Sequence, residues 1–175
     1  MGKILIVIDM LNDFVHKKGT LFFPAGADII PFIKGRIEHY ITNDYIIIFL
    51  CDAHDEDDKE FERFPKHAIK KTWGAGIVKE LVDAVAGYCS LETIPKTRYS
   101  GFYGTNLGTQ LADLAPDKVE VAGVCTSICC LMTIAGLANR NYDTTIHKNC
   151  VADFNQKAHN FSLEHMKNIF GTAII

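Results

Sequence analysis

Residues 3–9 read KILIVID, in which an unbroken apolar run follows Lys3 and ends at the carboxylate of Asp9. A continuous, β-branched run of this length is typical of a strand buried on both faces of a parallel sheet. Further short apolar runs follow it at residues 45–50, 90–94, 118–122, 144–147 and 172–175. Segments with apolar residues at helical spacing separate these runs, at residues 29–41, 76–86, 106–114, 127–139 and 158–169. This alternation predicts an α/β fold in which helices cover both faces of one parallel sheet.

The connection rules for such folds narrow the topology. Right-handed crossovers and double winding make 3-2-1-4-5-6 the simplest order for six parallel strands. In that order the switch point falls between the first strand and the fourth, and ligand sites open there at the carboxyl ends of the strands. A length of 175 residues suits one domain, spanning residues 1–175. We therefore predict a single three-layer α/β/α domain with its site at the carboxyl edge of the sheet.

Bulk composition narrows the class of protein. Hydrophobic residues make up 48% of the chain and charged residues 22%, an ordinary globular mixture. The formal net charge of −3 argues against a nucleic-acid partner. No apolar run approaches the ~18 residues that a membrane span needs, and Asp9 interrupts an opening segment too short for a secretory signal. We expect a cytoplasmic protein with no nucleic-acid and no membrane partner.

The cysteines lie mostly inside apolar stretches, at Cys51, Cys89, Cys125, Cys129, Cys130 and Cys150. Without a secretion signal, reduced thiols are favoured over disulfides. The spacing of the group at 125–130 does not match a zinc knuckle or a thioredoxin-type pair. We expect Cys51, Cys89, Cys130 and Cys150 to be core residues.

Reactive side chains follow the first four predicted strands in turn: Asp9, then Asp52 and His54, then Lys96, then Cys125 and Cys129. Because the carboxyl ends of parallel strands meet at one edge of a sheet, these residues are expected to converge. A carboxylate, an ammonium and a thiol at converging strand ends favour an enzyme over a passive binding module.

Cys129 is the candidate nucleophile. Residues 123–129 read GVCTSIC, a strand end and tight turn that start a helix, with Thr126 or Ser127 as the helix N-cap. In the first turn of that helix the dipole favours a thiolate. The alternative is that Cys129 packs as a small apolar residue, as free cysteines often do.

A thiol nucleophile needs a base and a partner for the developing charge. Asp9 is the natural base, since burial would raise the pKa of its carboxyl and help it accept a proton. Its alternative role is to cap the turn at residues 10–14. Lys96 would stabilise charge beside the pair, and its alternative is an ordinary solvated lysine.

A second cluster has the character of a metal site. Asp52 and His54 are two residues apart at a strand end, so their side chains share one face. His67 follows after an acidic segment that contains Glu60. Two imidazoles with carboxylates suit Zn²⁺, Mn²⁺ or Fe²⁺ better than Ca²⁺ or Mg²⁺. The alternative for residues 55–60 is a solvated acidic loop.

Five ordered motifs carry a family resemblance over nearly the whole chain: IDMLNDF (8–14), CDAH (51–54), FPKH (64–67), KTRYSGF (96–102) and AGVCTSIC (122–129). Together they resemble the isochorismatase-like cysteine hydrolases, and within them the nicotinamidases. The resemblance implies the isochorismatase-like, Rossmann-like fold and a triad of Asp9, Lys96 and Cys129. It also implies a metal, zinc first among the candidates, held by Asp52, His54 and His67, with Glu60 as a further ligand.

The resemblance extends to the substrate pocket. Phe14, Phe64 and Tyr99 match the aromatic walls around the substrate ring. A non-proline cis peptide is implied before Cys125, which would aim the backbone N–H groups of Cys125 and Cys129 into an oxyanion hole. The sequence departs from the family pattern at Ser127, where many relatives carry Asp, and at Cys130, where an aliphatic residue is usual.

The implied activity is hydrolysis of nicotinamide to nicotinate and ammonia through a cysteine thioester, a step of NAD salvage, with the metal orienting the pyridine nitrogen. The same pocket should admit close carboxamides such as pyrazinamide. The nearest alternative is another hydrolase of the superfamily, acting on isochorismate or an N-carbamoyl compound. The alternative from another class is a non-catalytic α/β module, although no G-x-G-x-x-G follows the first strand. Relatives commonly form homo-oligomers, and the sequence does not fix this state.

Overall fold

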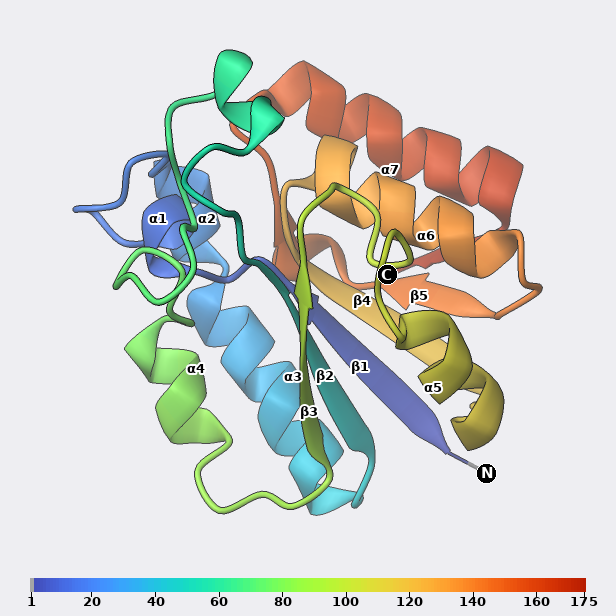
Figure 1. The fold of residues 1–175 in the computed structure, drawn as a ribbon. Helices are drawn as coiled ribbons and strands as arrows, with labels where there is room; N and C mark the ends of the chain where they lie inside the picture. The colour runs from blue at the N-terminus through green and yellow to red at the C-terminus, as the bar shows by residue number, and fades with distance from the viewer. Residues whose placement is uncertain (1) are drawn as a thin grey trace.

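A computed structural model of the chain describes residues 2–175 and contains one parallel sheet in the order β3-β2-β1-β4-β5-β7, with the short strand β6 paired to β4 (Figure 1). The strands are β1 (Lys3–Ile8), β2 (Ile46–Asp52), β3 (Leu91–Lys96), β4 (Lys118–Val124), β5 (Thr144–Ile146), β6 (Val151–Ala152) and β7 (Ala173–Ile174). All their pairings are parallel. The predicted strand order is confirmed, with β7 as the predicted sixth strand and β6 as an addition.

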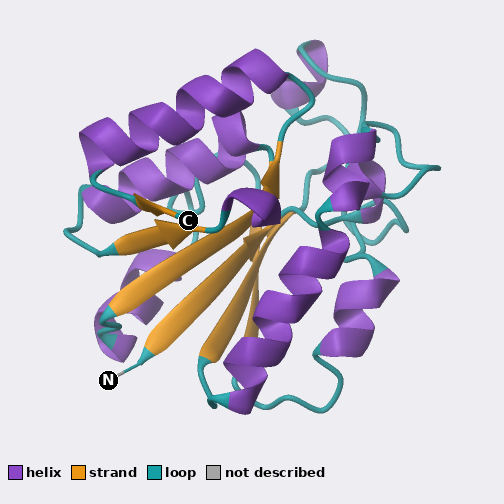
Figure 2. Cartoon of the chain, turned by 180° about the vertical axis from the view of Figure 1, so that it is seen from behind, coloured by secondary structure: helices purple, strands orange, loops and turns teal. Residues whose placement is uncertain are grey.

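Helices cover both faces of the sheet, as Figure 2 shows from behind. The α-helices are α1 (Asn12–Val15), α2 (Pro24–Asp28), α3 (Ile30–Thr42), α4 (Lys79–Ala84), α5 (Leu107–Leu114), α6 (Leu131–Ala138) and α7 (Gln156–Phe170). Shorter turns are the 3-10 helices η1 (Lys59–Glu62) and η3 (Lys148–Cys150) and the π-helical turn η2 (Thr126–Cys130). Helices α1 to α4 lie on one side of the sheet and α5 to α7 on the other (Figure 1).

The core follows from the period-2 alternation of the buried strands. On β1, Leu5 and Val7 pack toward α3, while Ile4, Ile6 and Ile8 pack toward the α5–α7 layer. All five side chains are fully buried. Full burial of an aliphatic side chain contributes about 1.5–3 kcal/mol, so this strand anchors both layers.

Strand register sets the geometry of the site. Ile8 pairs with Gly123 across β1 and β4, and Asp52 pairs with Lys96 across β2 and β3. Gly123 has φ +117°, and a Cβ there would lie 2.0 Å from the carbonyl oxygen of Ile8. Only glycine meets both conditions, so Gly123 lets β4 approach the end of β1 where Asp9 follows.

The structure corrects several sequence predictions. The helix expected over residues 127–139 begins with the π-helical turn η2, and only then continues as α6. A short helix, α2, precedes the one expected over 29–41. Cys51, Cys130 and Cys150 are buried as expected, but Cys89 is exposed because it lies in the turn between α4 and β3. Within residues 2–175, no helix has the length and apolar character to cross a membrane.

Candidate active site

The carboxyl ends of β1, β2 and β3 bring one ammonium between two carboxylates. Lys96 Nζ lies 2.8 Å from Asp9 Oδ2 and 2.6 Å from Asp52 Oδ1. The Lys96 side chain is completely buried, which excludes the solvated-lysine alternative. Burial alone would lower the pKa of Lys96, but Asp52 and Asp9 raise it well above the usual range. Lys96 is therefore a fixed cation inside the site.

Asp9 is held in an unusual backbone conformation at the end of β1. Its φ of +51° is in the left-handed region, which a non-glycine residue adopts at some energetic cost. Its Oδ1 accepts the backbone N–H of Asp52 at 2.8 Å, and its Oδ2 accepts Lys96. Burial, with the charge of Asp52, raises the pKa of Asp9 to about 6, while Lys96 opposes the rise. The Asp9 side chain is thus fixed toward the site and does not serve as a cap.

Cys129 completes the group of three from the far side of the switch point. Its Sγ lies 3.5 Å from Lys96 Nζ and within 4.8 Å of carboxylate oxygens of Asp9 and Asp52. Burial raises the pKa of the Cys129 thiol well above its usual range, although Lys96 opposes the rise. Burial thus opposes the thiolate that the start of a helix would favour. The thiol needs a neighbouring base to become nucleophilic.

The turn before Cys129 is held by a residue that the sequence analysis missed. Asp153 follows β6, which pairs with the end of β4. Its Oδ2 accepts the Ser127 N–H at 2.7 Å, and its Oδ1 accepts the Asn155 N–H at 3.0 Å. Asp153 therefore does the capping that was expected of Thr126 or Ser127. The predicted cis peptide between Val124 and Cys125 is present.

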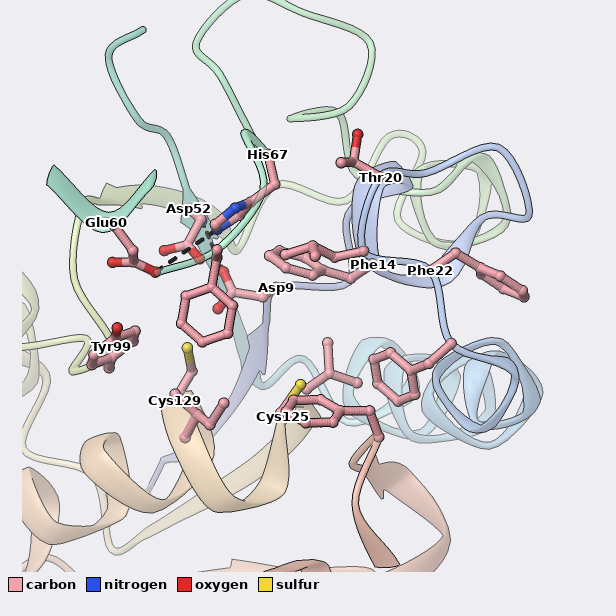
Figure 3. Close-up of a pocket in the computed structure, with 16 residues that line it drawn as sticks. Asp9, Phe14, Thr20, Phe22, Asp52, Glu60, His67, Tyr99, Cys125 and Cys129 are labelled. Carbon is pink, nitrogen blue, oxygen red and sulfur yellow. Dashed lines mark hydrogen bonds and ion pairs between the residues drawn. The ribbon is translucent and has the colours of Figure 1, made fainter. Parts of the chain in front are cut away.

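The second cluster has the donor set of a metal site. Ligand atoms of Asp52, His54 and His67 all lie within 4.8 Å of one another, and Glu60 Oε1 lies 3.8 Å from His67 Nε2. In Figure 3, Asp52, Glu60 and His67 point toward one another. Glu60 is almost completely buried, so the solvated-loop alternative is wrong for this residue.

Two features of these donors fit a bound cation. Within residues 2–175, His54 Nε2 and Glu60 Oε2 are buried without a hydrogen-bond partner, which is costly unless something else satisfies them. The other imidazole nitrogens are occupied: His54 Nδ1 lies 3.1 Å from Asp58 Oδ2, and His67 Nδ1 lies 2.7 Å from the Pro65 carbonyl. Such outer contacts are typical of histidines that bind metal through Nε2.

Two further carboxylates support the cluster, and sequence analysis assigned a role to neither. Asp58 accepts Arg98 Nη1 with both oxygens, at 3.0 and 2.9 Å, beside its contact with His54. Asp13 accepts the Ala68 N–H at 2.8 Å, directly after His67, and the Thr20 N–H at 3.2 Å. In the sequence, Asp13 could have been identified by its place in the IDMLNDF motif. Asp58 has no such signal, because it is one of several acidic residues in a row.

One cavity of about 360 Å³ connects the reactive group with the metal-like cluster. Its walls include the predicted residues Phe14, Phe64 and Tyr99, together with Asp9, Asp52, Glu60, His67, Cys125 and Cys129. His54 and Lys96 do not line it and lie fully buried behind the wall. Such an arrangement can hold a flat ring between aromatic side chains, with an electrophilic carbon against the thiol.

Comparison with known proteins finds similarity over nearly the whole chain. Residues 3–174 match the model of the isochorismatase domain. The isochorismatase family protein PncA of Bacillus subtilis is 35% identical, over 99% of both chains. A crystal structure of nicotinamidase PncA from B. subtilis is similar with a TM-score of 0.93, 34% identity and 99% coverage of both chains.

Two other solved structures bear on the chemistry. Pyrazinamidase of Pyrococcus horikoshii in complex with zinc has a TM-score of 0.90 at 27% identity, over all of this chain and 99% of its own. N-carbamoylsarcosine amidase from Thermoplasma acidophilum has a TM-score of 0.87 at 26% identity, over 99% of this chain and 95% of its own. The shared fold thus occurs with more than one substrate.

Proposed function

This chain belongs to the isochorismatase family of hydrolases, and from that premise we propose that it hydrolyses nicotinamide to nicotinate and ammonia. The observation that carries the proposal is the convergence, around one cavity, of Cys129, Asp9 and Lys96 with a cluster of metal-type donors. A thiol, a base and a cation suit acyl transfer, and the donor cluster suits a substrate with a ring nitrogen.

In the first half-reaction Asp9 takes the proton of the Cys129 thiol as the sulfur attacks the carboxamide carbon. The new C–S bond moves an electron pair onto the carbonyl oxygen. The backbone N–H groups of Cys125 and Cys129 would donate to this oxyanion, the role of a preorganised oxyanion hole. Lys96 stays protonated and offsets the negative charge carried by the site.

The first half-reaction ends when the electron pair on the oxyanion re-forms the carbonyl, the C–N bond breaks, and the proton held by Asp9 passes to the nitrogen, which leaves as ammonia. The second half-reaction is hydrolysis of the resulting thioester. Asp9 then takes a proton from a water molecule, whose oxygen attacks the thioester carbon. The C–S bond breaks, the sulfur recovers its proton, and nicotinate is released. One carboxylate thus serves both halves as base and then acid, which requires its fixed position next to the sulfur.

Asp52, His54, His67 and Glu60 are the residues that would hold the metal ion. Zinc is our first choice, supported by the zinc complex of the P. horikoshii pyrazinamidase, with manganese or iron as alternatives. When bound, the ion supplies a Lewis-acid position that fixes the ring nitrogen of the substrate. Phe14, Phe64 and Tyr99 pack around the ring. The nicotinate product would enter NAD salvage.

Ammonia release from nicotinamide by the zinc-loaded protein is the direct test. We expect turnover that chelation suppresses, and complete loss in Cys129→Ala with unchanged zinc content. Cys130→Ala is the matched control, because this adjacent buried thiol lies outside the cavity wall. Turnover of N-carbamoylsarcosine but not nicotinamide would overturn the substrate and keep the nucleophile. Turnover by Cys129→Ala would overturn the nucleophile.

A further inference from the structure

Lys96 lies among a second group of metal-type donors, formed by Asp9, Asp52 and Cys129. Ligand atoms of these three side chains all lie within 4.8 Å of one another, the same limit that the metal-like cluster meets. The Lys96 ammonium contacts each of them: Nζ lies 2.8 Å from Asp9 Oδ2, 2.6 Å from Asp52 Oδ1 and 3.5 Å from Cys129 Sγ. A cation, the ammonium, therefore already occupies the position that these donors surround.

Asp52 belongs to both groups of donors. Its Oδ1 contacts Lys96, while its Oδ2 lies 3.7 Å from His54 Nε2 in the metal-like cluster. Two-metal hydrolases hold their ions about 3.5–4 Å apart, and a carboxylate with one oxygen on each ion is a common bridge between them. The site thus has the layout of a two-metal site in which an ammonium takes one of the two positions.

The donors around Lys96 are chemically suited to a transition metal. Thiolate and carboxylate are both ligands of Zn²⁺, and sulfur selects for such softer ions. In Figure 3 the sulfur of Cys129 points toward the carboxylates of Asp9 and Asp52. A zinc ion held by these three groups would release the thiol proton to solvent and take up an electron pair of the sulfur. Cys129 would then be blocked as a nucleophile.

We propose that Lys96 excludes a divalent metal ion from Cys129 by filling the second position of what would otherwise be a two-metal site. The Lys96 side chain is completely buried, and its ion pairs within residues 2–175 are those with Asp9 and Asp52. A metal that displaced the ammonium would leave a buried charge without a partner, which is strongly unfavourable. The inference rests on the donor geometry and holds for any substrate that the site accepts.

Metal exclusion differs in its consequences from charge balance alone. A lysine that only balanced Asp9 and Asp52 would leave an unstable site when it is replaced. A lysine that excludes a metal would, when it is replaced by a small neutral residue, leave a site that takes up an ion with sulfur among its ligands. The ligation of the sulfur therefore separates the two roles.

Cobalt(II) is the probe for this difference, because thiolate ligation gives it an intense charge-transfer absorption that imidazole and carboxylate ligands do not give. The metal-like cluster contains no sulfur, so this band reports Cys129 alone, whether or not that cluster is filled. We expect no thiolate band in the wild-type protein at excess cobalt. Lys96→Ala should bind one more equivalent per chain, at least about a hundredfold more tightly than the wild type does, and should show the band.

Three further variants complete the experiment. Lys96→Ala combined with Cys129→Ala should lose the band, which assigns it to this thiol and not to another cysteine. Lys70→Ala is the matched control, because it removes an exposed lysine from an ion pair with Asp55 and should bind cobalt as the wild type does. Lys96→Gln removes the charge with less loss of side-chain volume and should also show the band, so it serves if Lys96→Ala does not fold.

Two results would overturn the inference. A thiolate band in the wild-type protein would mean that Lys96 does not keep the metal away from Cys129. Cobalt binding without the band in a folded Lys96 variant would mean that the three donors form no metal site. Failure of the protein to hydrolyse nicotinamide would overturn the proposed function and leave this inference standing, since no step of the cobalt experiment uses a substrate.

Discussion

Replacing Lys96 with methionine isolates the electrostatic role of the buried ammonium, because the two side chains have similar length and only one carries a charge. Lys96 Nζ contacts Asp52 at 2.6 Å and Asp9 at 2.8 Å, and the lysine side chain is fully buried. Removing one partner of a buried ion pair destabilises a protein by about 3–5 kcal/mol, because the remaining charge is left uncompensated.

Each carboxylate retains one other partner in Lys96→Met. Asp9 keeps the Asp52 N–H at 2.8 Å, and Asp52 keeps His54 at 3.7 Å. We therefore expect the loss for the whole site to stay near about 4 kcal/mol rather than double. With a urea m-value of about 2 kcal/mol per molar, the unfolding midpoint should fall by about 2 M. Turnover should fall at least about a hundredfold, since proton transfer between Cys129 and Asp9 loses its fixed counter-charge.

Urea unfolding of the metal-free protein, in the presence of a chelator, measures the stability loss directly. Lys70→Met is the matched control, since Lys70 Nζ lies 2.9 Å from Asp55 but both side chains are substantially exposed. The control should lose less than about 1 kcal/mol. A loss in Lys96→Met as small as in Lys70→Met would refute the view that a buried charge balance holds this site together.

Three further predictions test the supporting shell. Gly74→Ala would bring a Cβ to 2.1 Å from Asp13 Oδ2 and should destabilise the protein by about 1–3 kcal/mol. The control Gly35→Ala, in open space on α3, should stabilise the protein by about 0.5–1 kcal/mol. Thermal unfolding measures both changes, and equal effects would contradict the role of Asp13. Asp153→Ala should lower the free energy of unfolding by about 1–3 kcal/mol and reduce kcat more than it changes KM, and an unchanged kcat would show that the turn before the nucleophile holds without it. Glu60→Gln should weaken zinc affinity at least about tenfold in chelator competition, and an unchanged affinity would remove Glu60 from the donor set.

The sequence was sufficient to predict the sheet and the convergence of its reactive ends. Parallel strands buried on both faces give continuous apolar runs, so the residue at which each strand ends can be located in the sequence. The doubly wound strand order then brings Asp9, Lys96 and Cys129 together. The register of β2 against β3 then places Asp52 directly beside Lys96. These features depend on short-range pattern and on general rules of connection.

The supporting residues could not be predicted in the same way. Asp13 and Asp153 act by accepting backbone N–H groups far away in the chain, 55 and 26 residues from their own positions. A backbone donor carries no sequence signature, so such a carboxylate looks like any other loop aspartate. β6 is only two residues long, and without it the place of Asp153 beside the nucleophile turn is not apparent.

The pKa of the Cys129 thiol is another property that the local sequence could not predict. A position near a helix start favours the thiolate, and the pattern of residues 123–129 indicates such a position. The opposing effect is burial, which is a property of the folded molecule and not of the local sequence. In the fold, burial raises the pKa of the Cys129 thiol, while Lys96 opposes the rise.

Charge balance links the two halves of the site. Asp9, Asp52 and Glu60 are buried carboxylates around the cavity, and Lys96 is the one ammonium that contacts any of them within residues 2–175. Three carboxylates against one ammonium leave an excess of negative charge that the low-dielectric interior penalises. A divalent cation on Asp52, His54, His67 and Glu60 would offset that excess in the same position where it would hold the substrate ring. A metal ion in this cluster would therefore favour burial of the Asp9 carboxylate as well as place the proposed substrate, because Asp52 belongs to the cluster and also contacts the ammonium of Lys96.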